Sequence, residues 1–261
     1  MILAIDIGNT NITIGCYDGA ALQFVSRMAS DKTRMEDQYA IELRDILDIY
    51  GVAAKKIEGS IISSVVPPLT TYIGKAVQKI TDTIPLIVGP GIKTGLNIRI
   101  DNPGTLGADF VAGCVAALEQ YPCPCIVYDM GTATTIAVLD QNQNMIGGCI
   151  MPGVRTSLEA LCTRTAQLPQ IGLEAPSKVI GTNTIDCMNA GVVFGAASMV
   201  DGMCDRIEAE LGMPCTVVAT GGLAKDIVGH CRRTVLLSET LLLDGLCLLY
   251  QKNQSNTNIT K

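Results

Sequence analysis

The sequence predicts an α/β protein that is built from two copies of one domain plan. An apolar strand, an Asp-x-Gly turn with small polar residues and a second apolar strand occupy residues 5–15, and the same signature returns at residues 128–138. In each half a third strand, a helix, another strand and another helix follow in that order. This repeated order within one chain indicates internal duplication. We therefore expect one domain over residues 1–115 and a second over residues 116–261.

In the first half, short apolar runs bounded by polar turns predict strands, and Asp18-Gly19 supplies the hairpin turn between the second and third of them. Apolar residues spaced among charged ones predict an amphipathic helix, and Pro67-Pro68 suit the first turn of the next helix. The expected elements are strands over residues 2–7, 12–17, 22–28, 57–66 and 85–88, and helices over residues 36–50 and 67–81.

The second half repeats this pattern, and its expected strand over residues 215–220 ends at Gly221-Gly222. The last helix is apolar and is expected to pack back on the first half, whereas the polar tail over residues 251–261 is expected to fray. The expected elements are strands over residues 125–129, 134–139, 145–151 and 215–220, and helices over residues 156–162, 184–211, 223 onward and 239–250.

The Asp-x-Gly turns point to phosphate binding. Glycine lets the backbone approach a ligand closely, and neighbouring N–H groups with hydroxyl or amide side chains can cradle phosphate oxygens. The aspartate at the end of a buried strand can hold a cation. One copy alone would favour an ordinary glycine-containing hairpin, but two copies favour nucleotide binding. We predict two duplicated actin-like (ribonuclease H-like) domains with a nucleotide cleft between them.

Composition excludes several classes of partner. The chain has 261 residues, of which 48% are hydrophobic and 17% charged, as in a packed globular protein. A net charge of −6 gives no general attraction to nucleic acid or anionic membranes. No uncharged apolar run reaches about 18 residues, so no membrane span is expected. We expect neither nucleic acid nor membrane as a partner.

Cysteine and histidine usage bears on location and chemistry. There are eleven cysteines and no signal peptide, so we expect reduced, buried thiols in a cytoplasmic protein. Cys123-Pro124-Cys125 has one intervening residue and is a poor zinc or thioredoxin-type motif. The single histidine, His230, is expected on the surface of a helix. A carboxylate must therefore perform any acid–base step.

A candidate for that carboxylate lies between the halves. A Pro103-Gly104 turn leads into a helix, and Asp109 falls near the first turn of this helix. There it could accept a proton from a substrate hydroxyl. The alternative is a carboxylate that merely favours a helix N-terminus through the macrodipole. The position between two phosphate-binding halves favours the catalytic interpretation.

These motifs, in this order and spacing, closely resemble those of the type III pantothenate kinases over nearly the whole chain. The matching pieces are Asp6-Ile7-Gly8-Asn9-Thr10-Asn11, Ile62-Ser63-Ser64-Val65-Val66-Pro67, Gly89-Pro90-Gly91, Lys93-Thr94-Gly95, Asn102-Pro103, Gly107-Ala108-Asp109, Asp129-Met130-Gly131-Thr132-Ala133-Thr134-Thr135, Gly147-Gly148, Pro152-Gly153, Thr165-Ala166-Gln167-Leu168-Pro169, Gly181-Thr182-Asn183-Thr184 and Thr220-Gly221-Gly222.

The resemblance implies ATP-dependent phosphorylation of pantothenate, the first step towards coenzyme A, by a homodimer whose pantothenate pocket is completed across the interface. It implies that Thr132 contacts ATP, that Asp129 holds a monovalent cation (K⁺ or NH₄⁺), that Mg²⁺ comes with the nucleotide and that Asp109 is the general base. The implied first phosphate loop comprises Asp6, Ile7, Gly8, Asn9, Thr10, Asn11, Ile12 and Thr13. The implied pantothenate-binding residues are Gly107, Ala108, Asp109, Phe110 and Thr184.

Two positions depart from the family pattern. Phe110 stands where the family usually has an arginine, which could clamp the carboxylate of pantothenate. Ala137 stands where an aspartate is common. These changes leave two alternatives open: a nucleotide-binding regulatory homologue with impaired catalysis, or an actin-like kinase for another small hydroxy-acid or sugar.

Overall fold

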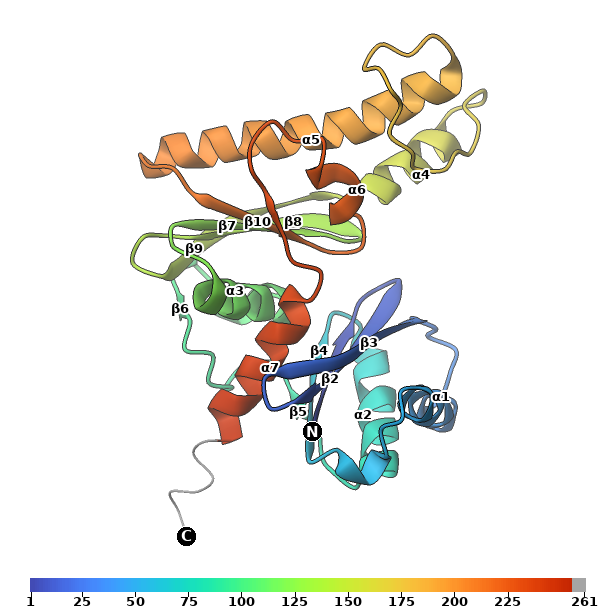
Figure 1. Ribbon diagram of the computed structural model, residues 1–261, viewed down its shortest axis with the longest axis vertical. Coiled ribbons are helices and arrows are strands. Elements are labelled where there is room, and N and C mark those ends of the chain that lie inside the picture. Colours follow the sequence, from blue (N-terminus) through green and yellow to red (C-terminus); the bar gives the residue numbers. More distant parts are fainter. Residues whose placement is uncertain (255–261) are drawn as a thin grey trace. The chain divides into compact units, whose positions relative to one another are not determined.

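The computed structural model describes residues 1–254, which form two compact units. The first unit contains Met1–Leu96, Asp101–Ala116 and the chain from Leu241 onward. The second contains Asn97–Ile100 and Ala117–Thr240. Each unit has its own mixed sheet flanked by helices (Figure 1), which confirms the predicted α/β fold with two domains of one plan.

The first unit is built on a five-stranded sheet of order β3-β2-β1-β4-β5. β1 pairs with β2 antiparallel and with β4 parallel. The short β5 extends the sheet next to β4. The strands are β1 (Ile2–Ile7), β2 (Asn11–Asp18), β3 (Ala21–Ala29), β4 (Gly59–Ser64) and β5 (Leu86–Ile87).

The strands of this sheet carry apolar side chains on both faces, and helices cover each face. Ile5 and Ile7 of β1 join the buried core formed with α1 (Glu36–Ile49) and α2 (Pro67–Thr81). Successive residues of a strand point to opposite faces, so Asp6 projects away from that core. The other face contacts α7 (Leu241–Gln254), which packs on β1, β2 and β4.

The second unit repeats the first strand for strand. Its sheet has the order β11-β10-β7-β8-β9-β6, and its five strands other than β6 reproduce the first sheet, with β7 in the place of β1. β7 again pairs antiparallel with the next strand and parallel with the inner strand β10. The strands are β6 (Asn97–Ile98), β7 (Cys125–Met130), β8 (Ala133–Leu139), β9 (Asn144–Pro152), β10 (Thr216–Thr220) and β11 (Leu236–Leu237).

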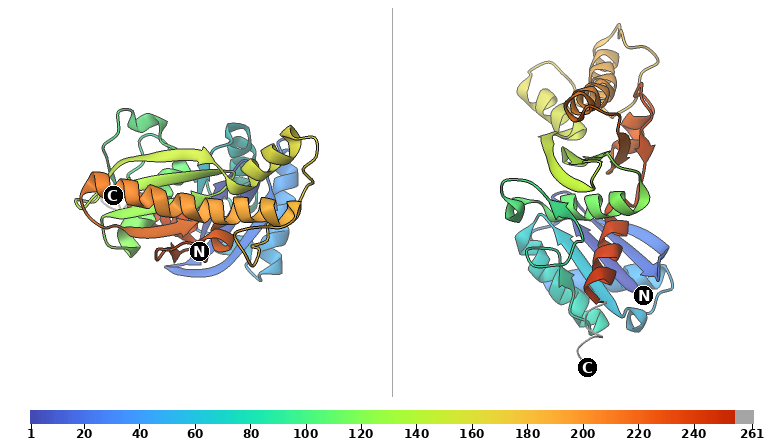
Figure 2. Two further views of the ribbon diagram at one scale, coloured as in Figure 1. Left: turned by 90° about the horizontal axis from the view of Figure 1, so that it is seen from above. Right: turned by 90° about the vertical axis from the view of Figure 1, so that its left-hand side faces the viewer.

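The long helix α5 (Thr184–Leu211) runs across one face of the second sheet, with α4 (Val154–Arg164) and α6 (Ala224–Val228) beside it (Figure 2). By length and composition alone α5 could cross a membrane. Val193, Ala197 and Val200 are nevertheless buried in the core of the second unit, where they pack with Ile126 and Tyr128 of β7. This is the environment of a core helix in a globular domain.

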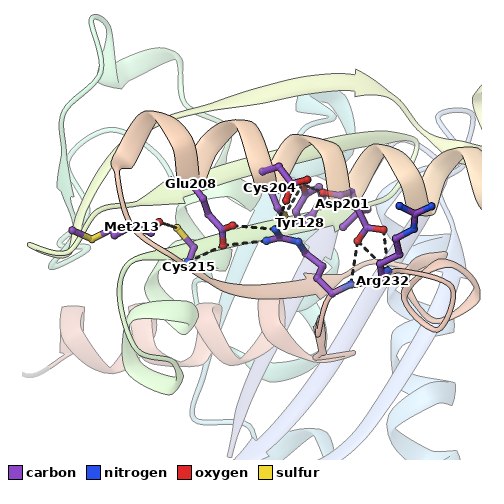
Figure 3. A network of polar contacts seen from close by, with 10 residues as sticks. Tyr128, Asp201, Cys204, Glu208, Met213, Cys215 and Arg232 are labelled. Atoms are coloured by element: carbon purple, nitrogen blue, oxygen red, sulfur yellow. Dashed lines mark hydrogen bonds and ion pairs between the residues drawn. The ribbon is translucent and has the colours of Figure 1, made fainter.

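A polar network fixes α5 to the sheet (Figure 3). The Tyr128 hydroxyl donates to the Val200 carbonyl at 3.2 Å. Arg233 donates to both carboxylate oxygens of Glu208, at 3.1 and 3.0 Å. This pairing holds the pKa of Glu208 below its usual value. Because Tyr128 directly precedes Asp129, the network anchors the strand that carries a predicted site residue.

Most predicted elements occur within a few residues of their expected bounds, and the exceptions have physical causes. β6 and β11 were not predicted because two residues carry no periodicity. Gln251–Gln254 were expected to fray but form the last turn of α7, where Asn253 donates to carbonyls of Lys93 and Leu249. The rest of the tail, residues 255–261, lies outside the described residues.

Two further expectations concern His230 and the cysteines. His230 is exposed, as expected, but it lies in the turn after α6 rather than in a helix. None of the eleven cysteines forms a disulfide, but only five are buried, and Cys187 is exposed.

Candidate functional site

The first phosphate-loop candidate joins β1 to β2. Gly8 donates its N–H to the Asn11 carbonyl at 3.0 Å, which closes the turn. A Cβ at Gly8 would lie 3.0 Å from that same carbonyl oxygen, so the tight turn favours glycine. Asn9 and Thr10 are exposed at the tip. The turn therefore offers exposed backbone and polar side chains to a ligand, as a phosphate-binding loop requires.

Asp6 precedes this loop at the carboxyl end of β1. It pairs in register with Thr13 on β2 and with Ser63 on β4. Part of the residue is exposed, yet the surrounding protein removes enough solvent to raise the pKa of Asp6 to about 7. The Ser63 hydroxyl opposes this rise and the negative charge of Asp109 adds to it. Asp6 is thus poised between its charged and neutral forms near neutral pH.

Asp109 lies in the first turn of α3 (Ala108–Gln120). Its Oδ1 accepts the N–H of Phe110 at 2.9 Å. A Cβ at Gly107 would lie 2.3 Å from the same oxygen, so glycine makes room for the carboxylate. The negative charge of Asp109 raises the pKa of Asp6, so the two predicted site residues lie within electrostatic range of each other in the first unit.

The second loop, Gly131 and Thr132, joins β7 to β8 with one residue fewer than the first. Gly131 donates its N–H to the Ala133 carbonyl at 3.0 Å, repeating the bond of Gly8. Asp129 pairs in register with Thr135 on β8 and with Thr220 on β10. In sheet position it is the counterpart of Asp6.

A glycine packs directly against Asp129. Gly221 follows β10 with φ of +95°, and a Cβ there would lie 2.5 Å from Asp129 Oδ1 and 2.6 Å from the Met130 nitrogen. Both the backbone conformation and the contact require glycine at this position. Gly222, by contrast, has open space where its Cβ would be.

Thr184 lies elsewhere in the second unit. It is the first residue of α5 and lines a groove of about 1030 Å³ between β8, β9, α4 and α5. Tyr128 points to the α5 side of the sheet, so the adjacent Asp129 points to the opposite side. Within one chain, the second unit therefore places Thr184 and Asp129 on different faces of its sheet.

The predicted residues thus fall into three groups. Asp6 and the first loop form one group with Asp109, which lies with Ala108 and Phe110 in the first turn of α3, directly after Gly107. Asp129 and Thr132 share the second loop. Thr184 stands apart in the groove of the second unit.

Sequence reasoning missed several contacts to the loops. Ser63 could have been found from the parallel pairing of β1 and β4, which sets it beside Asp6. Ser30 and Thr156, whose hydroxyls bond to loop carbonyls, belong to no motif. Over residues 1–254, no three His, Cys, Asp or Glu side chains gather as they would to hold a metal ion.

Comparison with known proteins gives a consistent family. The model of the type III pantothenate kinase family matches residues 2–206. A type III pantothenate kinase from Halalkalibacterium halodurans is 44% identical over 253 residues, covering 97% of this chain and 100% of the relative. One from Exiguobacterium sp. is 42% identical over 254 residues, covering 97% and 100%.

Solved structures share the fold at low sequence identity. The activator of the 2-hydroxyisocaproyl-CoA dehydratase from Clostridium difficile, with bound ADPNP, superposes with a TM-score of 0.60 and 12% identity, covering 100% of this chain and 98% of that one. Component A of the Acidaminococcus fermentans (R)-2-hydroxyglutaryl-CoA dehydratase gives 0.58 and 17% identity, covering 97% and 98%. These two likenesses bear on the fold alone.

Proposed function

Since the chain belongs to the type III pantothenate kinase family, we propose how its residues divide the work of phosphorylating pantothenate. The family transfers a phosphoryl group from ATP to pantothenate in coenzyme A biosynthesis, and the nucleotide comes with a divalent metal. The single observation that carries the residue assignment is that the negative charge of Asp109 acts on Asp6, which precedes a glycine turn in the first unit.

Asp109 is the general base in this proposal. It accepts the proton of the pantothenate hydroxyl as that oxygen bonds to the γ-phosphorus of ATP and the bond to the leaving ADP breaks. Its Oδ1 is oriented by the Phe110 N–H, and Gly107 leaves space beside it. Asp6, with its raised pKa, can ionise fully when the cationic magnesium of the nucleotide approaches.

The nucleotide is held by backbone rather than by a strong local positive charge. Asp6–Thr13 supply the first phosphate loop and Thr132 contacts ATP from the second. Both turns are closed by the same N–H···O=C bond. Mg²⁺ delivered with the nucleotide would neutralise charge on the phosphates.

Asp129 is the proposed ligand of a monovalent cation, K⁺ or NH₄⁺. Its carboxylate ends a buried strand and faces away from α5, and the adjacent Gly221 lets backbone approach it closely. Carboxylate and carbonyl oxygens are the ligands that such hard cations prefer.

The acceptor pocket combines Gly107, Ala108, Asp109 and Phe110 with Thr184, which we propose comes from the partner subunit of a homodimer. Thr184 and Asp129 lie on opposite faces of their own sheet, so a pocket completed by another copy accounts for an isolated Thr184. The region around Thr184 also exposes large apolar side chains, including Ile180 at 82% and Ile185 at 51%. Exposed apolar groups of this kind mark protein interfaces.

Phe110 leaves the carboxylate of pantothenate in need of another cation. Arg155 is exposed on α4, between the groove-lining Val154 and Ser157, and makes no ion pair within the described part of the chain. We propose Arg155, from either subunit, as a substitute, with Arg99 as the second choice. We also propose a cytoplasmic location, consistent with eleven cysteines that form no disulfide, and no nucleic-acid or membrane partner.

A coupled assay of ADP release tests the proposal as a whole. Release should require pantothenate and should be faster in potassium than in sodium at equal ionic strength. Release without phosphorylated pantothenate, or with another hydroxy-acid only, would contradict it. Light scattering in the same buffers should give twice the mass of one chain.

A further inference from the structure

Each candidate phosphate loop accepts hydrogen bonds from the segment that follows the third strand of its sheet, β3 in the first unit and β9 in the second. In each unit this segment supplies one backbone N–H and one side-chain hydroxyl, and both donate to loop carbonyls. We propose that this pair, here named the loop bracket, positions the loops for ATP, with Ser30 and Thr156 as its positioning residues. The inference rests on the proposed nucleotide-binding function of the two loops.

In the first unit, one residue provides both bonds. Ser30 follows β3, and its N–H donates to the Thr10 carbonyl at 2.9 Å. Its hydroxyl donates to the Gly8 carbonyl at 2.6 Å. The two ends of the loop are thus tied to a single point. Ser30 is itself half-buried, and the next N–H, that of Asp31, donates to the buried Tyr39 hydroxyl at 3.1 Å.

In the second unit, two residues share the task. Gly153 follows β9, and its N–H donates to the Thr132 carbonyl at 3.1 Å. The Thr156 hydroxyl, from the first turn of α4, donates to the same carbonyl at 2.7 Å. A Cβ at Gly153 would lie 2.3 Å from the Gly131 oxygen, so glycine is required for this approach. Thr10 and Thr132 hold equivalent places, and each accepts the equivalent N–H.

The direction of these bonds explains what the bracket does. In a trans peptide the C=O and the following N–H point in opposite directions. Holding the Gly8 carbonyl against Ser30 therefore turns the Asn9 N–H away from Ser30. A phosphate attracts N–H groups and repels carbonyl oxygens, so a loop free to rotate its peptides would present the wrong group part of the time. The bracket keeps three carbonyls engaged and reduces the cost of ordering the loop on binding.

Thr156 gives the cleaner test, because Thr156→Val keeps the shape of the side chain and removes the hydroxyl. We expect the KM and Kd for ATP to rise roughly three- to tenfold, the range of one neutral hydrogen bond, with the KM for pantothenate unchanged. Thr156→Ser should restore wild-type values. The control is Thr163→Val in the same helix, whose hydroxyl bonds only to the helix carbonyls of Glu159 and Ala160.

Ser30→Ala makes the same test in the first unit, with Thr33→Val as its control because that hydroxyl bonds to Asp31 in the same connection. A merely structural role would lower the melting temperature of bracket and control variants alike. The bracket predicts that only Thr156→Val and Ser30→Ala lose part of the stabilisation that ATP adds to each variant. If wild type binds ATP and both variants bind it equally well, the bracket is wrong. If wild type itself does not bind ATP, the proposed function fails first.

Discussion

Asp6 in the first unit and Asp129 in the second occupy the same place in their sheets. Each is the last residue but one of its central strand, pairs with a threonine on the antiparallel neighbour and lies beside a hydroxyl residue on the neighbouring parallel strand. Each is followed by a glycine whose N–H closes the turn. Duplication has therefore preserved the backbone around both carboxylates.

The surroundings of the two carboxylates differ at the residue that follows each aspartate's partner on the neighbouring parallel strand. In the first unit that residue is Ser64, whose hydroxyl accepts the N–H of Val66 at 3.0 Å. In the second it is Gly221, which packs against Asp129. Burial raises the pKa of the first carboxylate, and the negative charge of Asp109 raises it further. The same sheet position therefore carries a carboxylate with a raised pKa in the first unit and, by our proposal, a cation ligand in the second.

The largest expected effect on turnover comes from Asp109, in the first unit. Asp109→Asn keeps the shape but cannot accept a proton, so turnover should fall by about 10²-fold or more while the Kd for ATP stays within about twofold. Steady-state kinetics with calorimetric ATP binding measure both. Turnover near the wild-type value would remove Asp109 from the mechanism.

Asp129→Ala tests the proposed cation site in the second unit. Removing a carboxylate that faces a cation should raise the KM for ATP by roughly 30-fold and make activity equal in potassium and sodium. The assay compares the two salts at one ionic strength, and Asp6→Ala, tested alongside, should keep a ratio between the salts in whatever activity remains. A potassium response that survives in Asp129→Ala would place the cation site elsewhere.

Gly221→Ala probes the residue that distinguishes the two environments. The positive φ and the contact with Asp129 should displace the carboxylate and lower kcat/KM for ATP by roughly tenfold, together with a lower melting temperature. Gly222→Ala, at a position with open space, is the matched control and should behave as wild type. Equal behaviour of the two variants would show that the close packing around Asp129 does not matter for catalysis.

Asp6→Asn tests the raised pKa of Asp6 through the pH dependence of the free energy of unfolding. The pKa of Asp6 rises from 3.8 to about 7 on folding. Between these values the folded state keeps a proton that the unfolded state has released, so raising the pH destabilises the wild type. Asp6→Asn should remove this penalty and gain on the order of 1 kcal/mol at pH 8 relative to pH 4.5, a value reduced for partial solvent exposure. Urea unfolding at the two pH values measures it, and a constant difference between variant and wild type would contradict it.

The sequence was sufficient for features that lie close together in the chain. The Asp-x-Gly turns, the strand order in each half and the apolar last helix follow from local patterns of residues. The electrostatic effect of Asp109 on Asp6 could not be predicted in this way, because the two residues lie about a hundred positions apart in the chain and only tertiary structure relates them. The separate roles of Gly221 and Gly222 depend on the φ angle and on the atoms near each residue, and two consecutive glycines look the same in the sequence. Ser30 and Thr156 belong to no sequence motif, so their hydrogen bonds to the loops are visible only in the three-dimensional structure.

The last helix has a consequence for how the protein is made. α7 buries Leu241, Leu243, Leu246 and Leu249 and contacts β1, β2 and β4, and its Asp244 accepts a 2.6 Å bond from the Tyr17 hydroxyl, 227 residues earlier. During synthesis the ribosome delivers β1 first and α7 last, so one face of the first sheet stays uncovered while the entire second unit is translated. Such long-range contacts slow folding and expose apolar surface in the meantime. The unit that begins the chain is the last to be completed.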